Sequence, residues 1–375
     1  MTEAALTATP LFAADRVRAR GWVVAWWATG RLLVFAGAAI VHFTGPRAYA
    51  GSDERAHLLG LLGAWDGRWY RIVAQHGYLL EPGRQSDPAF FPLFPLLLRA
   101  GHALGLGYLT AGLVISNVAF LAALVAFEEL THALFGGDVA RRATAYVALF
   151  PLGFVFSLMY PESLVLCAIA LTVLAALHCR WAVAAVIFAV GTLARPEMMF
   201  VALPLLPLAL GERRPRVRGI ALGAVVAPFA ALGSFALYLG LRLHDPLAWM
   251  HAERAWGRRF TPIGLVTALE HLPKAIAGNA WVVRDVVFFV VYLVLFALAL
   301  RAGVPRLWVL AGATIVVLPT FSGSFNSIGR FGLLAPAMFW GLAAAGRSRR
   351  MDTAIRALSA TLLVAATITL PFAFP

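Results

Sequence analysis

The feature that most constrains this chain is a series of apolar runs, many of them close to the length that crosses a bilayer. A helix needs about 20 apolar residues to span a hydrocarbon core of ~30 Å. The runs fall near 22–43, 89–106, 109–134, 142–159, 162–179, 181–210, 219–241, 281–300, 306–320, 331–345 and 355–373. Only 13% of the residues are charged, about half of the roughly 25% typical of soluble domains. The sequence therefore predicts an all-α fold, a polytopic transmembrane helical bundle of about 11 spans (roughly 10–13) forming one domain over 1–375.

The chain is strongly basic, with 31 Lys and Arg against 18 Asp and Glu and a formal net charge of +13. In a soluble protein this excess would indicate a nucleic-acid partner. Here the basic clusters lie in short loops at 16–20, 213–218, 301–306 and 347–350, where membrane topology and lipid phosphates account for them. We therefore expect these loops in the cytoplasm, membrane lipids as neighbours, and no nucleic-acid partner.

The number of crossings has to agree with that assignment. An even number must separate the first two basic clusters, which requires 181–210 to be a single span interrupted at Arg195. The same scheme leaves Arg141, Arg142 and Arg180 on the outer face, against the positive-inside rule.

Two long polar stretches, 44–88 and 242–280, then fall on the extracytoplasmic face. The rest of the chain divides into a first span at 22–43, a helical bundle over 89–241 and C-terminal spans over 281–373. Long ordered loops are usually functional. The single lysine and the richness in Ala, Leu, Arg and Gly are typical of a GC-rich bacterial genome. The expected location is therefore the plasma (inner) membrane, with the active site outside.

The first of these loops contains an amphipathic helix predicted near 65–76. One face gathers aromatic and apolar side chains, and the other carries polar and cationic ones. The two sets are Trp65, Trp69, Ile72, Val73 and His76, and Arg68, Arg71 and Gln75. This pattern is typical of a helix lying in the membrane interface, and Gly77 would end it. Trp65, Arg68 and His76 are candidate substrate contacts.

Asp66 stands at the start of this helix, and two roles remain open for it. One is an N-cap, because Asp accepts hydrogen bonds from the free N–H groups of a first turn. The other is a general base, held by a rigid helix where a lipid head group would arrive. Asp53 and Glu54 in the same loop are weaker candidates, since a solvated charge pair accounts for them.

Five short motifs follow one another along the chain. They are Trp-Asp-Gly-x-Trp-Tyr-x-x-x-Ala-x-x-Gly-Tyr at 65–78, Phe-Phe-Pro-Leu-Phe-Pro-Leu at 90–96, Tyr-Pro-Glu-Ser at 160–163, Leu-Ala-Arg-Pro-Glu at 193–197, and Ser-Ile-Gly-Arg-Phe at 327–331. The ordered set resembles the GPI mannosyltransferase II (PIG-V-like) family of the GT-C superfamily of membrane glycosyltransferases.

The resemblance implies a polyprenyl- or dolichyl-phosphate-mannose lipid donor, catalysis on the extracytoplasmic face and no cofactor. It also implies an essential acid in the first external loop, which corresponds to Asp66 here. The sequence departs from the family pattern at Phe331, where many relatives carry Tyr.

The remaining candidates lie further along the chain, and each has a structural alternative. Trp256, in the second loop, is a candidate sugar contact, or part of an interfacial aromatic belt. Arg330 is a candidate ligand of a lipid phosphate, or a snorkelling helix-end arginine. Ser327, three positions before it, is a further candidate substrate contact. Arg195 interrupts an apolar run, where charges are costly unless paired or facing a cavity. It would bind substrate, or pair with Glu197 or with Glu162, and this topology places Glu162 on the wrong face for catalysis.

These groups suit a single displacement in which Asp66 deprotonates an acceptor hydroxyl while Arg330, and then Arg68, offset charge on the leaving phosphate. No metal-binding motif is present. We therefore expect an inverting α-mannosyltransferase acting on an extracytoplasmic glycan or glycolipid. The alternatives are a GT-C enzyme using another lipid-linked sugar or a protein acceptor, and a lipid or solute transporter.

Overall fold

The computed structural model describes residues 21–45 and 58–372. Asp53 and Glu54 lie outside the described residues, as does the basic cluster at 16–20. Within the described part every regular element is a helix, and five helices are long and apolar enough to cross a membrane. The predicted all-α, multi-span membrane architecture is confirmed.

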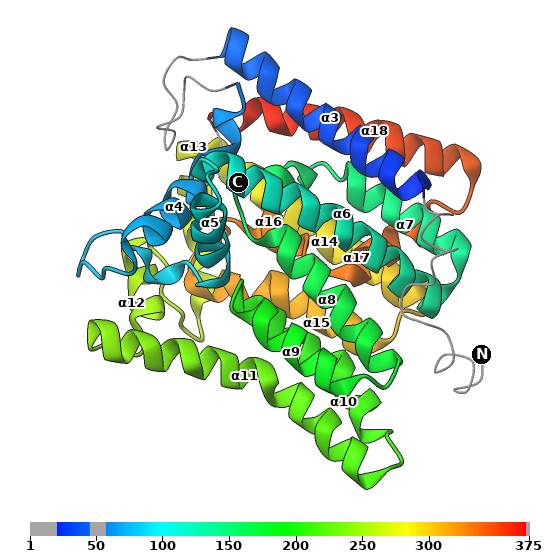
Figure 1. Cartoon of the computed structure of the whole chain (residues 1–375). Coiled ribbons are helices and arrows are strands. Elements are labelled where there is room, and N and C mark those ends of the chain that lie inside the picture. The colour runs from blue at the N-terminus through cyan, green and yellow to red at the C-terminus, as the bar shows by residue number, and fades with distance from the viewer. Residues whose placement is uncertain (1–20, 46–57, 373–375) are drawn as a thin grey trace.

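The five long helices form the outline of the bundle. They are α3 (Gly21–Thr44), α6 (Tyr108–Phe135), α11 (Pro215–Leu243), α14 (Ala280–Arg301) and α18 (Arg349–Thr369). At 1.5 Å per residue these helices are about 31 to 43 Å long, enough to cross a hydrocarbon core of ~30 Å. Helices α3 and α18 pack along one edge of the bundle, and α11 along the opposite edge (Figure 1).

Shorter helices fill the space between them. They are α7 (Gly137–Leu149) with η3 (Gly153–Ser157), α8 (Glu162–Leu177), α9 (Trp181–Thr192), η4 (Pro196–Val201) with α10 (Ala202–Leu210), α15 (Arg306–Val317) with η5 (Leu318–Ser322), and α17 (Pro336–Ala345). Helix α8 is buried along most of its length because it packs against both α6 and α9.

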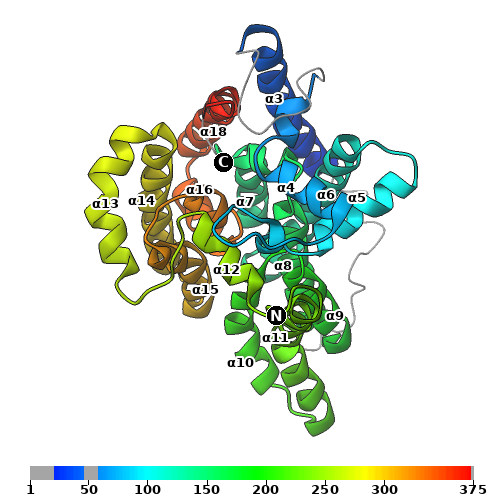
Figure 2. The same cartoon turned by 90° about the vertical axis from the view of Figure 1, so that its left-hand side faces the viewer.

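The two ends of the bundle differ. The turns that join α6 to α7, α10 to α11 and α17 to α18 lie at one end (Figure 1). The other end, which faces the viewer in Figure 2, carries short elements. They are η1 (Gly60–Gly63), α4 (Asp66–His76), η2 (Asp87–Ala89), α5 (Leu93–Ala103), α12 (Ala248–Ala255), α13 (Gly264–Gly278) and α16 (Ile328–Gly332).

The expected span at 89–106 is wrong. This segment forms the 11-residue helix α5, which is only about 16 Å long and cannot cross a bilayer. Pro92 caps its start and the left-handed Gly105 (φ +88°) follows its end. Its apolar side chains Phe94 and Leu98 are buried inside the protein, so their hydropathy reflects packing against neighbouring helices.

The expected interruption at Arg195 is present, but the single span expected at 181–210 is wrong, because the chain forms two separate segments there, α9 and the pair η4 and α10. Helix α9 ends at Thr192, and Arg195 is extended, with φ −157° and ψ 135°. The residue before a proline avoids helical geometry, and Pro196 follows Arg195. The break therefore brings Arg195 to the end of the bundle that carries α4 and α5.

A buried arginine supports another irregular stretch of backbone. Arg31, in the middle of α3, is 2% exposed. Its guanidinium donates to the hydroxyl of Ser157 (2.7 Å) and to the carbonyl of Gly153 (3.2 Å), and it lies over the ring of Phe120. Non-helical backbone within a membrane needs such internal partners, so Arg31 supplies donors where η3 replaces regular helix.

Candidate active site

Asp66 is the first residue of α4, after Trp65 in a non-helical conformation with φ 58°. The N-cap position of α4 belongs to Trp65 and not to Asp66, so the N-cap interpretation of Asp66 is wrong. The carboxylate is 4% exposed and accepts from Arg330 Nη1 at 2.5 Å. The backbone N–H of Asp66 donates to the hydroxyl of Tyr160 (3.0 Å). Asp66 is thus a buried, ion-paired carboxylate.

Arg330 is held by a tight turn at the start of α16. Ser327 has a left-handed conformation, φ 69°, and its N–H donates to Asp285 Oδ2 at 2.7 Å. The N–H of Gly329 donates to Asp285 Oδ1 at 3.3 Å, and the hydroxyl of Tyr292 donates to the carbonyl of Gly329. Asp285 is fully buried, so one carboxylate and one hydroxyl fix the turn that aims Arg330 at Asp66.

Arg195 belongs to the same charged cluster. It donates to both carboxylate oxygens of Glu197, at 2.8 and 3.1 Å, and to Glu162. The same oxygen of Glu162 is 3.9 Å from Arg330 Nη1. Glu162 therefore lies beside Asp66, and the expectation that it sits on the opposite face is wrong. The cause is the pair of misassigned spans at 89–106 and 181–210.

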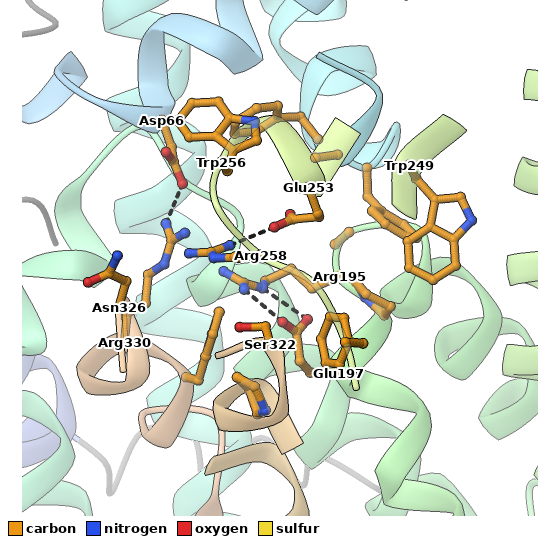
Figure 3. Close-up of a pocket in the computed structure, with 18 of the residues that line it drawn as sticks. Asp66, Arg195, Glu197, Trp249, Glu253, Trp256, Arg258, Ser322, Asn326 and Arg330 are labelled. Carbon is orange, nitrogen blue, oxygen red and sulfur yellow. Dashed lines mark hydrogen bonds and ion pairs between the residues drawn. The ribbon is translucent and has the colours of Figure 1, made fainter. Parts of the chain in front are cut away.

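An inner cavity of about 160 Å³ opens onto this cluster (Figure 3). Ion-paired side chains line it together with aromatic ones. The residues that the site geometry uses are Asp66, Arg195, Glu197, Trp249, Glu253, Trp256, Arg258, Ser322, Asn326 and Arg330. The inner cavity thus joins a carboxylate, several guanidinium groups and flat aromatic surfaces, the elements of a site for a phosphate and a sugar.

Arg258 is a site residue that sequence analysis missed. Its guanidinium donates to Glu253 at 3.0 Å and to the hydroxyl of Ser327 at 3.0 Å. It lines the inner cavity and both of the cavities that adjoin it. The available signal was the run of arginines at 254–259, which is hard to distinguish from a charged surface loop.

The lateral cavity, of about 740 Å³, shares a wall with the inner cavity. The shared residues include Pro196, Glu197, Trp249, Glu253, Arg258 and Pro319. Beyond this wall the lining is partly apolar and partly basic. It comprises Met199, Phe200, Ile315 and Leu318, and His251, Arg254 and Arg259.

A third cavity, the aromatic cavity of about 370 Å³, also has Asp66 in its lining. It is lined by Trp65, Asp66, Arg68, Trp69, Gln85, Trp256, Arg258, Trp281 and Asn326. Asp66, Trp256, Arg258 and Asn326 line the inner cavity as well. Asp66 therefore faces two cavities of different character.

The sequence-predicted residues divide between these spaces. Asp66, Arg330, Arg195 and Trp256 line the inner cavity. Trp65 and Arg68 line only the aromatic cavity among the cavities described above, and Ser327 is buried beneath them. His76 is exposed at the far end of α4, about 15 Å along the helix from Asp66, so the structure does not bring it to the site.

The helix face predicted for α4 needs correction. Its buried residues are Asp66, Gly67, Tyr70, Val73 and Ala74, so α4 packs on the protein through Tyr70 and Ala74, with His76 facing solvent. Burial raises the pKa of Tyr70 well above its usual value, so this phenol stays neutral beside the charged cluster.

A hydrogen bond joins the two ends of the loop after α4: the carboxylate of Asp87 accepts from the N–H of Leu79 at 2.8 Å. Burial raises the pKa of Asp87 to about 6. Just before Leu79, Tyr78 donates its hydroxyl to the carbonyl of Phe90 at 2.7 Å. These two bonds join the start of the loop to its end and so close the segment that carries Gln85.

No protein-family model and no curated protein matches the sequence. Two solved structures from Archaeoglobus fulgidus resemble the structure. One is the oligosaccharyltransferase AglB in complex with an inhibitory peptide and a dolichol-phosphate, with 13% identity and a TM-score of 0.47 over 93% of this chain and 55% of that chain. The other is the oligosaccharyltransferase in complex with Zn and sulfate, with 13% identity and a TM-score of 0.43 over 90% of this chain and 52% of that one. The chain spans about half the length of these structures.

Proposed function

We propose that this protein is a GT-C glycosyltransferase that moves mannose from a polyprenyl-phosphate-mannose donor to a hydroxyl of an extracytoplasmic glycan or glycolipid. The observation that carries the proposal is the buried ion pair of Asp66 with Arg330 between two cavities. The ordered motifs at 65–78, 90–96, 193–197 and 327–331 supply residues that line the inner cavity. The motif at 160–163 supplies Tyr160 and Glu162, which bond to Asp66 and Arg195. Mannose rests on the family resemblance.

The reaction is a single in-line displacement. The acceptor oxygen forms a bond to the anomeric carbon while the bond from that carbon to the phosphate oxygen breaks, and its electron pair leaves with the phosphate. The proton of the acceptor hydroxyl passes to Asp66, which acts as general base. One displacement inverts the anomeric carbon, so a β-linked donor gives an α-mannoside.

The donor phosphate is assigned to Arg330 and Arg258. Both line the inner cavity, and charge that develops on a leaving phosphate is stabilised by cations already in place. The phosphate competes with Asp66 for Arg330, which leaves the carboxylate of Asp66 free to accept a proton. Arg195 already makes a bidentate pair with Glu197, so its role is to hold the cluster together. Arg68 lines the aromatic cavity and becomes an acceptor contact.

The lateral cavity is assigned to the lipid part of the donor. Its apolar side chains, such as Met199 and Ile315, suit an isoprenoid chain, and its cations Arg254 and Arg259 suit the head-group region. The shared wall with the inner cavity lets one molecule occupy both spaces.

The proposed sidedness follows from the two corrected spans. Removing the crossing at 89–106 and splitting 181–210 leaves the number of crossings unchanged. It moves Arg141, Arg142 and Arg180 to the same side as the other basic loops, as the positive-inside rule requires. The Nε of Arg142 donates to the carbonyl of Ala343, next to the basic loop at 347–350. The site then lies on the extracytoplasmic face.

The test uses the purified full chain in proteoliposomes with a radiolabelled polyprenyl-phosphate-sugar and a membrane extract as acceptor. The mannose donor is expected to label a glycan or glycolipid, whereas the matching glucose donor is not. Transfer from the glucose donor alone would show that the sugar is glucose and not mannose. Label on protein would show that the acceptor is a protein, and movement of lipid without sugar transfer would indicate a transporter.

A variant pair tests the phosphate assignment. Arg258→Gln is expected to raise the donor KM, because it removes a cation from the inner cavity. Arg242→Gln, at the exposed end of α11, is the matched control and should leave the donor KM unchanged. Equal donor KM values for both variants would remove Arg258 from the phosphate site.

A further inference from the structure

The aromatic cavity is lined by four tryptophans. Trp65 and Trp69 come from the start of α4, Trp256 follows α12, and Trp281 lies at the start of α14. They come from segments far apart in the sequence, so only the folded chain brings their indole rings together. Indole offers a large, rigid apolar face with one polar N–H, which suits a ligand that has both apolar faces and polar edges.

Contacts among the rings and with the backbone hold this wall in place. Trp69 stacks on Phe90, with ring centroids 5.8 Å apart, and meets Trp256 edge-on at 5.4 Å. Trp65 donates its indole N–H to the carbonyl of Leu370 at 3.1 Å. A surface fixed in this way loses little conformational entropy when a ligand binds.

The polar groups of the aromatic cavity are planar amides and a guanidinium, which are suited to bind a ligand that carries hydroxyl groups. Gln85 and Asn326 each carry an amide that both donates and accepts hydrogen bonds, and Arg68 carries a guanidinium donor. The indole N–H of Trp256 is buried and has no hydrogen-bond partner. A buried donor without a partner is costly, and a ligand oxygen would satisfy it.

The cavity meets the charged cluster at Asp66. Trp256 lies next to Asp66 and Asn326 next to Arg330 in the inner cavity (Figure 3), and Asp66, Trp256 and Asn326 also line the aromatic cavity. A hydroxyl of a molecule in the aromatic cavity can therefore reach the carboxylate of Asp66. The lateral cavity by contrast has a single tryptophan and no amide side chain in its lining.

We propose that the aromatic cavity is a saccharide-binding site that holds the acceptor through a pyranose ring packed on tryptophan, with its hydroxyls on Gln85, Asn326 and Arg68. This inference rests on the proposed function for the role of Asp66, and it deepens that function by naming the acceptor part that is recognised. The C–H face of a pyranose matches indole, and its hydroxyl edge matches the amides. A bare lipid presents no such combination, and a peptide lacks a ring with several hydroxyls on one edge.

The test measures binding without any donor. The purified full chain in detergent is titrated with mannotriose, maltotriose and chitotriose, followed by saturation-transfer NMR and tryptophan fluorescence. The tripeptide Gly-Ser-Thr and dihexanoyl phosphatidylglycerol serve as the comparison ligands. At least one saccharide is expected to bind, and Trp281→Ala should weaken it by about tenfold or more through the lost ring contact. Trp249→Ala, on the inner and lateral cavities only, should not.

Three results would overturn the inference: no saccharide binds, Trp281→Ala leaves binding unchanged, or the tripeptide or the lipid binds in the same cavity instead. Loss of saccharide binding alongside intact mannosyl transfer would refute this inference alone. Saccharide binding that depends on Trp281, without transfer from any lipid-linked sugar, would refute the proposed function and leave the cavity assignment standing.

Discussion

Gly264, the first residue of α13, packs against the backbone of Phe321. Its replacement by alanine should displace the loop that carries Arg258 without changing any side chain of the site. A Cβ at this position would lie 1.8 Å from the carbonyl oxygen of Phe321, whereas real Cβ contacts essentially never fall below 3.0 Å. The backbone must therefore separate by at least ~1.2 Å at this point, since neither partner is a flexible side chain.

The same displacement would move Arg258, which lines the cavities. The N–H groups of Arg259 and Thr261 donate to the carbonyls of Ser322 and Phe321, both at 3.0 Å, and Arg258 precedes them directly. Displacing a positioning group by about 1 Å costs roughly 10²-fold in rate. We expect Gly264→Ala to lower the transfer rate by about that factor and to lower the unfolding free energy by roughly 1–3 kcal/mol through overpacking.

The assay compares initial rates of mannosyl transfer and thermal unfolding in detergent for Gly264→Ala and Gly223→Ala. Gly223 lies within α11 with no atom near its would-be Cβ, so alanine there should keep the wild-type rate and, by its higher helix propensity, not lower stability. Wild-type transfer and stability in Gly264→Ala would refute the argument that this contact fixes the position of Arg258.

Three further outcomes are expected. Tyr292→Phe leaves the buried carbonyl of Gly329 without its hydroxyl donor and should lower the unfolding free energy by about 1–3 kcal/mol; unchanged thermal unfolding would contradict this. Asp87 has a pKa raised from 3.8 to about 6, so between those values the folded protein binds more protons than the unfolded chain, and stability should fall as pH rises through that window. Asp87→Asn should remove that part of the slope in melting temperature measured from pH 4 to 7, and an unchanged slope would count against it. The product of a β-linked donor should carry an α-mannosyl linkage by NMR, and a β-linkage would rule out single displacement.

The sequence located α4 and the end of this helix at Gly77, because amphipathic spacing and a left-handed glycine are local signals. It could not pair Asp66 with Arg330, which lies 264 positions away, since that contact exists only in the folded bundle. The cost of a charge within an apolar run suggested Glu197 or Glu162 as a partner of Arg195, and the structure shows both pairs.

The errors have a common physical origin in hydropathy. Part of the apolar run at 89–106 is the face of α5 that is buried in protein, including Phe94 and Leu98, and composition alone does not distinguish that from burial in lipid. The run at 181–210 is two segments because Pro196 follows an extended Arg195. Asp285 was overlooked inside an apolar run, although a charge at such a position is itself a functional signal.

The most direct test of the central claim is the rate of mannosyl transfer by Asp66→Asn in proteoliposomes, beside Asp138→Asn, an exposed aspartate in the first turn of α7. Gel filtration first establishes that both variants are folded. Glu162, whose carboxylate lies 3.9 Å from Arg330 Nη1, remains in Asp66→Asn as a second carboxylate near this arginine. General-base catalysis contributes roughly 10²–10⁴-fold, so Asp66→Asn should lose at least that much activity while Asp138→Asn keeps the wild-type rate. Wild-type transfer by folded Asp66→Asn would contradict the account.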